Sequence, residues 1–235
     1  MGSIAGVIDN NATITNCYNT GLISAETSVN YSTSAGGIVG YLYRGSVTNC
    51  YNTGSASAAT MFDDSYAGGI AGLLSGYVTN CYNTGDVSAS SAGDVAYTHA
   101  GGIAGALTGF VTNCYNTGNV SASCDYSAYA GGIAGYNYGA VTACYYLDNM
   151  STGVGDGNGT TTACTAEQMK LQSTFTDFDF DTVWTISGNE FYPFPELKNT
   201  PMVTVILIGD VDGNGSVTVA DALKILRVAV GLTTF

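Results

Sequence analysis

The sequence predicts a mainly β protein: a parallel β-solenoid (β-helix) of about five turns, a C-terminal aromatic cap and a small calcium-binding loop with a helix. The first observation behind this prediction is a repeat that begins with Ala-Gly-Gly-Ile and continues with Val-Thr-Asn-Cys-Tyr or a close variant. It starts at Ala35, Ala67, Ala100 and Ala130, and a partial copy starts at Gly2. The second observation is that no repeat has a helical apolar period, and that Gly or Asn separates its short apolar runs. We therefore expect three short strands in each turn.

Stacking of the turns predicts ladders of identical side chains, because equivalent residues of a parallel solenoid lie about 4.8 Å apart on successive turns. One ladder holds the thiols Cys17, Cys50, Cys81, Cys114 and Cys144, and another holds Ile38, Ile70, Ile103 and Ile133. We interpret the thiols as packing groups. Disulfides between adjacent turns and a metal site are the alternatives, although zinc needs ligands that converge on one point and stacked thiols lie along a line.

A bend in each turn is predicted at a repeated asparagine. Val78 and Cys81 can both point inward only if the chain turns between them, at Asn80. Asparagine tolerates the left-handed conformation that a corner needs, and its amide can pair with the amide of the next turn. We expect this role at Asn16, Asn49, Asn80 and Asn113.

Several chemically capable residues lie outside these ladders. Cys124 and Cys164 are candidates for a disulfide bridge, which the sequence alone does not establish. His99 is the one histidine of the chain and precedes Ala100 at a loop end, where we expect it to be exposed. Asp148, Asp156 and Asn158 lie in or beside a glycine-rich stretch at 153–159 and could bind a cation, but we favour a flexible loop there.

The composition excludes some classes of partner. The 235 residues carry a net charge of −13, from 18 acids against five bases. Because Lys and Arg are the groups that hold phosphate, we exclude nucleic acid and disfavour an anionic membrane surface. No apolar run reaches the length of a membrane span, and no secretory leader precedes the repeats.

The repeats resemble the GLUG motif family, short glycine-rich repeats of bacterial surface proteins and adhesins. The resemblance is carried by Gly-Gly-Ile-Ala-Gly followed by Val-Thr-Asn-Cys-Tyr-Asn-Thr-Gly, and it covers about residues 2–149. It implies a protein that is secreted or held at the cell surface of a bacterium, with an adhesive or spacer role. We assign residues 1–149 to the GLUG-repeat solenoid.

Residues 150–200 are expected to form the C-terminal cap. Thr165 and Gln168 have the spacing of a capping box, which predicts a short helix through about Gln172. Nine aromatic or apolar residues follow between Phe175 and Phe194. Their position after the last turn favours a cover for the open end of the solenoid, and a sugar-binding platform is the alternative.

Residues 201–235 are expected to form a strand, a calcium loop and a helix. The loop runs from Asp210 to Asp221 and has the alternating oxygen ligands and the central glycine, Gly215, that calcium loops require. The predicted ligands of Ca²⁺ are Asp210, Asp212, Asn214, the backbone carbonyl of Ser216, Thr218 and Asp221. A strand-like segment, 202–208, precedes the loop in place of an entering helix.

The loop and its following helix, residues 209–232, resemble one half of a type I dockerin. That resemblance implies a cohesin on a scaffoldin as partner. A dockerin has two such segments and this chain shows one, so the resemblance supports calcium binding more strongly than cohesin binding.

These observations together favour a non-enzymatic extracellular adhesion or spacer protein with a calcium-binding, dockerin-like anchoring segment. Its candidate partners are a cohesin or scaffoldin, a carbohydrate or host surface, and other copies of itself through the solenoid ends. A filament subunit that stacks end to end is the alternative, because the first turn exposes a strand edge. A β-helix enzyme that degrades polysaccharides is less favoured, because the solenoid offers only Arg44, His99 and scattered acids as catalytic groups.

Overall fold

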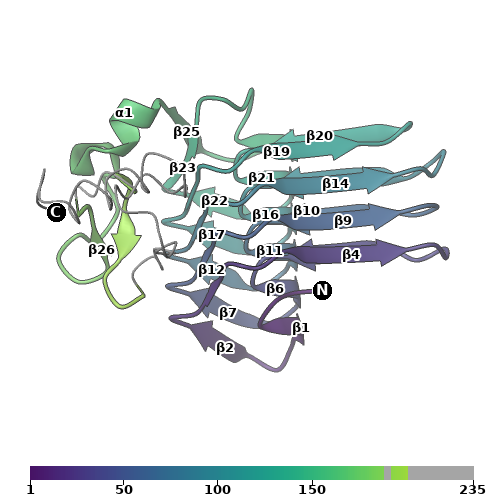
Figure 1. Ribbon diagram of the computed structural model, residues 1–235, viewed down its shortest axis with the longest axis horizontal. Coiled ribbons are helices and arrows are strands. Elements are labelled where there is room, and N and C mark those ends of the chain that lie inside the picture. The colour runs from purple at the N-terminus through teal and green to yellow at the C-terminus, as the bar shows by residue number, and fades with distance from the viewer. Residues whose placement is uncertain (188–191, 201–235) are drawn as a thin grey trace, which may run out of the picture.

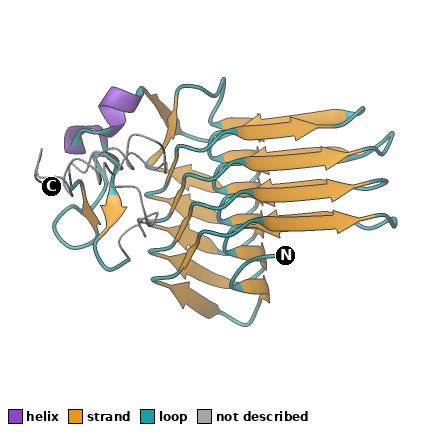
Figure 2. Ribbon diagram, in the orientation of Figure 1, coloured by secondary structure: helices purple, strands orange, loops and turns teal. Residues whose placement is uncertain are grey.

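Parallel strands stacked turn upon turn make up most of the computed structural model, which describes residues 1–187 and 192–200 (Figures 1 and 2). Each strand pairs with the equivalent strand of the neighbouring turn, so that five parallel sheets, A to E, run along the stack. The expected parallel β-solenoid is confirmed, with about four turns.

The sheets are defined by the following strands. Sheet A contains β5 (Thr33–Gly36), β10 (Ser65–Gly68), β15 (Tyr97–Gly101) and β20 (Ser127–Gly131). Sheet B contains β1 (Ala5–Ile8), β6 (Val39–Leu42), β11 (Ala71–Leu74), β16 (Ala104–Leu107), β21 (Ala134–Asn137) and β24 (Val154–Gly157). Sheet C contains β2 (Ala12–Thr15), β7 (Gly45–Thr48), β12 (Tyr77–Thr79), β17 (Phe110–Thr112) and β22 (Ala140–Thr142). Sheet D contains β3 (Tyr18–Asn19), β8 (Tyr51–Asn52), β13 (Tyr82–Asn83), β18 (Tyr115–Asn116), β23 (Cys144–Leu147) and β25 (Thr161–Cys164). Sheet E contains β4 (Ile23–Thr27), β9 (Ala56–Thr60), β14 (Val87–Ser91) and β19 (Val120–Ser123).

A complete turn holds five short strands, so the expectation of three is wrong. The first glycine of each Gly-Gly-Ile segment ends a sheet A strand, and the second glycine and the isoleucine form a corner between sheets A and B rather than part of a strand. A Cβ atom on Gly37 would lie 2.1 Å from the carbonyl oxygen of Gly69 on the next turn. The corner therefore admits no side chain, and the repeat needs glycine at this position.

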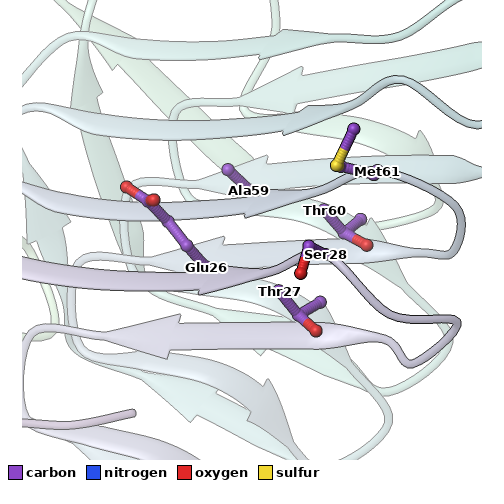
Figure 3. A pocket seen from close by; sticks show the side chains of 6 residues that line it. All are labelled: Glu26, Thr27, Ser28, Ala59, Thr60 and Met61. Atoms are coloured by element: carbon purple, nitrogen blue, oxygen red, sulfur yellow. The ribbon is translucent and has the colours of Figure 1, made fainter.

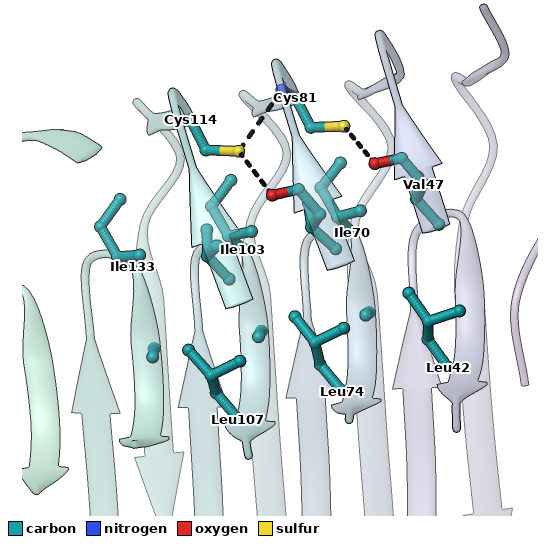
Figure 4. Close-up of a cluster of buried hydrophobic side chains, with 14 of the residues drawn as sticks. Leu42, Val47, Ile70, Leu74, Cys81, Ile103, Leu107, Cys114 and Ile133 are labelled. Atoms are coloured by element: carbon teal, nitrogen blue, oxygen red, sulfur yellow. Dashed lines mark hydrogen bonds between the residues drawn. The ribbon is translucent and has the colours of Figure 1, made fainter. Parts of the chain in front are cut away.

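The main core lies between sheets B and C and is built from the expected ladders (Figure 4). All four ladder isoleucines and the thiols of Cys50, Cys81 and Cys114 are fully buried, which confirms their packing role. The Cys81 thiol donates to the carbonyl oxygen of Thr79 at 3.3 Å, and the Cys81 N–H donates to the sulfur of Cys114 at 3.4 Å. All seven cysteines are free thiols, including Cys124 and Cys164, so the candidate disulfides are absent.

The asparagine corners are confirmed. Asn16, Asn49, Asn80 and Asn113 all have φ of 53°, in the left-handed region, and the Asn80 amide donates to the Asn49 side chain at 3.2 Å. The fifth repeat keeps the same corner with Ala143, at φ of 50°. Alanine has no side-chain amide to offset the steric cost of that conformation.

A second asparagine ladder was not expected from the sequence. It consists of Asn19, Asn52, Asn83 and Asn116, which are buried in sheet D. Each amide donates to the next, with N···O distances of 2.7, 2.8 and 2.8 Å. Because an unpaired amide is costly when buried, this ladder helps to fix the register of the turns.

Sheets E and A form a thin arm on one side of the stack, and loops join their strands at its tip (Figure 1). The two sheets face each other through small side chains, mainly alanines such as Ala58 and Ala67. The inward side of sheet A is therefore filled by alanine, and its larger side chains lie on the outward side.

The segment after the last turn begins with the expected capping box. The Thr165 hydroxyl accepts from the Gln168 N–H at 3.2 Å, and the Gln168 side chain accepts from the Thr165 N–H at 2.8 Å. Helix α1 (Ala166–Met169) ends sooner than expected, and a 3₁₀ turn, η1 (Gln172–Thr174), follows. Strands β26 (Trp184–Thr185) and β27 (Glu196–Leu197) then form an antiparallel pair, sheet F.

The aromatic cap covers the flank of the solenoid rather than only its open end. Phe175, Phe178 and Trp184 form one buried cluster with tyrosines of sheet D. The Trp184 ring lies 6.1 Å from the Tyr82 ring and 5.9 Å from the Tyr115 ring, which belong to successive turns. Figure 1 places α1 and β26 beside the stack. Tyrosine side chains repeated at one position of every turn make a continuous apolar flank, which needs this cover.

The solenoid continues past the expected boundary at residue 149. Strands β24 and β25 pair with β21 and β23 and extend sheets B and D through Cys164. The expectation of a flexible loop at 153–159 is wrong, since residues 154–157 form β24. The expected third unit, 201–235, lies outside the described residues. Among the residues described, no helix is long and apolar enough to cross a membrane.

Candidate binding groove

A groove lies where the outward faces of sheets A and B meet at an inside corner. The second glycine of each Gly-Ile-Ala-Gly segment makes this corner tight: a Cβ atom on Gly105 would lie 2.8 Å from the backbone nitrogen of Ala67. The corner encloses a hollow of about 600 Å³. Its lining is aromatic and acidic, and consists of Asp64, Tyr66, Leu73, Tyr97, His99, Ala106, Thr108, Tyr129, Tyr136 and Asp156.

Sheet A contributes a ladder of three rings. Tyr66, His99 and Tyr129 are register partners on successive turns, and their side chains point outward because the neighbouring alanines point inward. The His99 ring stacks on Tyr66 at 5.6 Å and on Tyr129 at 5.4 Å, with interplanar angles of 5° and 11°. The histidine is thus held between two tyrosine rings.

Sheet B forms the opposite wall, with a different residue on each turn. Leu73, Ala106, Tyr136 and Asp156 occupy equivalent positions on β11, β16, β21 and β24. Ala106 is small, and it leaves space opposite the rings of sheet A. The Tyr136 ring lies 5.1 Å from the His99 ring at an angle of 54°, so it is tilted out of the stack.

The two carboxylates of the groove differ in their hydrogen bonding. Asp64 accepts the Tyr66 hydroxyl with one oxygen and the Tyr97 N–H with the other, both at 2.8 Å. Burial, together with the Asp64 carboxylate, raises the pKa of Tyr66. Asp64 therefore stabilises the wall itself, and the Tyr66 hydroxyl stays protonated.

Asp156 receives no hydrogen bond from the described residues. It lines the main hollow and also a second one of about 370 Å³, formed by residues 136–139 and 156–158. Of the three residues considered for a cation, Asp156 and Asn158 line this second hollow and Asp148 does not. Asp156 is thus a half-buried carboxylate at the junction of two hollows.

His99 is buried, and the expectation that it would be exposed is wrong. Only 5% of its surface is accessible, because it lies in the middle of β15 and between two rings. Burial lowers the pKa of His99, while the charges of Asp64 and Asp156 act in the opposite direction. Its Nδ1 atom is buried and has no hydrogen-bond partner among the described residues. A neutral ring nitrogen without a partner is a costly group to bury. His99 also belongs to the lining of the hollow.

Two other hollows are less suited to a ligand. One, of about 330 Å³, lies on the arm beside Glu26 and Met61 and has no aromatic ring in its lining (Figure 3). The other, of about 490 Å³, lies on the aromatic cap beside Phe175 and Phe178. Those two rings are buried against Tyr145, so the sugar platform considered for this segment offers little open ring surface.

The predicted calcium ligands lie outside the described residues. Calcium binding by 210–221 stays a prediction. Within the described residues, no group of three or more His, Cys, Asp or Glu side chains is placed to hold a metal ion.

The groove was missed because sequence reasoning followed the identical positions of the repeat. Its walls occupy two positions that differ from turn to turn: Ser34, Tyr66, His99 and Tyr129 in sheet A, and Tyr41, Leu73, Ala106 and Tyr136 in sheet B. Outward positions are free of the packing demand that keeps the ladders uniform. The sequence signal that could have indicated the groove was the presence of aromatic and titratable residues at these variable positions.

Comparison with known proteins supports the solenoid and its repeats. Residues 31–57 and 63–88 match the GLUG motif, which confirms the resemblance for these two repeats. The fold is similar to the crystal structure of a protein from Bacteroides ovatus named as a candidate immunoglobulin A1 protease, with a TM-score of 0.55 and 21% sequence identity. The match covers 84% of this chain and 63% of that structure, and at this identity it shows the fold alone. No curated protein matches the chain.

Proposed function

We propose that the chain is a non-enzymatic extracellular adhesion or spacer protein, and that its solenoid binds carbohydrate in the groove between sheets A and B. The observation that carries this proposal is the lining of the groove. Ring edges and a tilted ring face supply apolar contacts, while tyrosine hydroxyls, Thr108 and Asp156 supply hydrogen-bond partners. A sugar ring needs both, because it has apolar C–H faces and a rim of hydroxyls.

Binding is favoured over catalysis by the state of the titratable groups. Glycoside hydrolysis needs two carboxyl groups that are free to act on the substrate. Asp64 uses both of its oxygens within the wall, and Asp156 has no second free carboxylate beside it in the lining. His99 is stacked between rings and makes no hydrogen bond to a nucleophile among the described residues. The likeness to a protein named as a protease carries no activity to this chain at 21% identity.

Glycan binding is tested with an array of neutral, cationic and acidic oligosaccharides. We expect the chain to retain at least one class, and Tyr136→Ala to lose that binding because the tilted ring is removed. Tyr77→Ala is the matched control, since Tyr77 is exposed on sheet C outside the groove. The proposal is wrong if no class binds, or if Tyr136→Ala and Tyr77→Ala bind as the parent does.

The anchoring role belongs to the predicted calcium loop. We infer that residues 210–221 bind one Ca²⁺ and that 209–232 attach the protein to a cohesin or scaffoldin outside the cell. Three carboxylates and an asparagine amide in this spacing support calcium over other divalent ions. Calcium titration should give one site per chain, Asp210→Ala should abolish it, and Asp177→Ala in the cap should not. An unchanged stoichiometry in Asp210→Ala would contradict the assignment.

A further inference from the structure

The groove carries negative charge and has no lysine or arginine in its lining. The described residues include three bases, Arg44, Lys170 and Lys198, and none of them lines either hollow. The chain as a whole has a net charge of −13. Such a field opposes uronic, sialic or sulfated sugars and favours neutral or cationic ones.

The environment of Asp156 favours cationic sugars over neutral ones. Its carboxylate has no donor among the described residues, and it stands at the junction of the two hollows, where a ligand that fills either one meets it. A half-buried carboxylate gains most from a charged donor, because a hydrogen bond between two ions is about twice as strong as one between neutral groups. A protonated amine satisfies Asp156 better than a sugar hydroxyl does.

The groups around Asp156 also suit an amine. Its register neighbour Tyr136 is half-buried and its ring is tilted against the His99 ring, and a cation is attracted to the face of such an aromatic ring. Across the hollow, His99 lines the opposite wall, and its buried Nδ1 has no hydrogen-bond partner among the described residues. The free carboxylate, the tilted ring and the unpartnered nitrogen lie on three separate elements, β24, β21 and β15.

We propose that the groove recognises amino sugars: oligosaccharides whose free, protonated amine binds Asp156 while their rings lie against Tyr136 and the edges of the sheet A ladder. This inference rests on the proposed glycan binding and names its ligand class. N-acetylated sugars of the same backbone, which lack the charge, are expected to bind more weakly.

The test compares two probes that differ only in the amine: the glucosamine hexamer, with free amines, and the N-acetylglucosamine hexamer. Binding to the full chain is measured by calorimetry at about pH 6, below the pKa of a sugar amine. The glucosamine hexamer should bind at least about tenfold more tightly. Asp156→Asn, which keeps the shape and removes the charge, should abolish that preference. Asp86→Asn is the control for overall charge, since Asp86 is exposed outside the groove, and it should keep the preference.

Each outcome separates this inference from the proposed function. Equal binding of both hexamers, lost in Tyr136→Ala, would overturn the amine preference and leave glycan binding in place. Binding of neither hexamer, nor of other glycans, would overturn both. If Asp86→Asn and Asp156→Asn lose the preference equally, the glucosamine hexamer is attracted by the net charge of the chain. That result would overturn a specific amine site at Asp156. Both variants should have the same thermal unfolding midpoint as the parent protein, which confirms that they fold.

Discussion

Two tyrosine-bearing ladders run along this solenoid, and they differ in what covers them. In sheet D the rings of Tyr51, Tyr82 and Tyr115 stack 4.9 and 5.1 Å apart and are fully buried beneath the aromatic cap. In sheet A the rings of Tyr66, His99 and Tyr129 stack at similar distances, but the cap does not reach them and they line an open hollow. The same stacking thus supports a sealed face in one place and a groove in the other.

The difference follows from the sequence of the repeat. The sheet D ladder has the same residue on each of its turns, as a face that packs against one cover requires. The sheet A ladder changes from serine to tyrosine to histidine to tyrosine, and the opposite wall of sheet B changes on every turn. Uniform positions of the repeat hold the fold together, and variable outward positions give one groove its particular chemistry.

The largest expected effect separates the sealed face from the open one. Trp184 is fully buried between the cap and two sheet D tyrosines, so Trp184→Ala should lower the free energy of unfolding by about 3–5 kcal/mol. Tyr136→Ala in the groove should cost less than about 1 kcal/mol, because its ring is only half-buried. Urea unfolding measures both. Equal losses would mean that the groove is as much a part of the packed structure as the cap.

A smaller effect is expected in the thiol ladder, which lies in the core between the two faces. Cys81→Ala should cost about 1–3 kcal/mol through lost packing. In the native protein, thiol reagents should modify the partly exposed Cys17 and Cys124 quickly and Cys81 only after unfolding. Mass spectrometry of the labelled chain distinguishes these sites. Rapid labelling of Cys81 in the native protein would mean that the thiol ladder faces solvent rather than the core, and would contradict this assignment.

The smallest expected effect is the pH dependence of stability that comes from His99 in the sheet A ladder. Burial holds the pKa of His99 below the value of about 6.5 that it has in an unfolded chain. Between those two pKa values the unfolded chain binds a proton that the folded chain does not, so stability falls as the pH falls through that window. The parent should therefore lose more stability between about pH 7 and pH 5 than His99→Phe, which keeps a stacked ring without titrating. A parallel pH dependence in both would show that His99 does not titrate across folding.

Sequence reasoning was successful where one residue type recurs at one position. The isoleucine and cysteine ladders, the left-handed corners at Asn49 and Asn80, and the capping box at Thr165 all follow from local chemistry and a fixed spacing. It failed where the answer depends on how separate sheets meet. The burial of His99 and the place of the cap on the flank are set by the corner between sheets A and B and by the tyrosine face of sheet D. End-to-end association and the dockerin-like partner stay predictions.

The contrast between the buried sheet D ladder and the sheet A ladder that lines the groove is tested most directly by hydroxyl-radical footprinting. The measurement is made with and without the glucosamine hexamer. In the free protein we expect modification of Tyr97, Tyr129 and Tyr136, and almost none of Tyr82 and Tyr115, which are fully buried. Addition of the hexamer should protect the groove tyrosines and leave exposed Tyr77 unchanged. Modification of Tyr82 and Tyr115 at the rate of the groove tyrosines would contradict the sealed face. Groove tyrosines that gain no protection from this hexamer or from any glycan retained on the array would contradict the groove as the binding site.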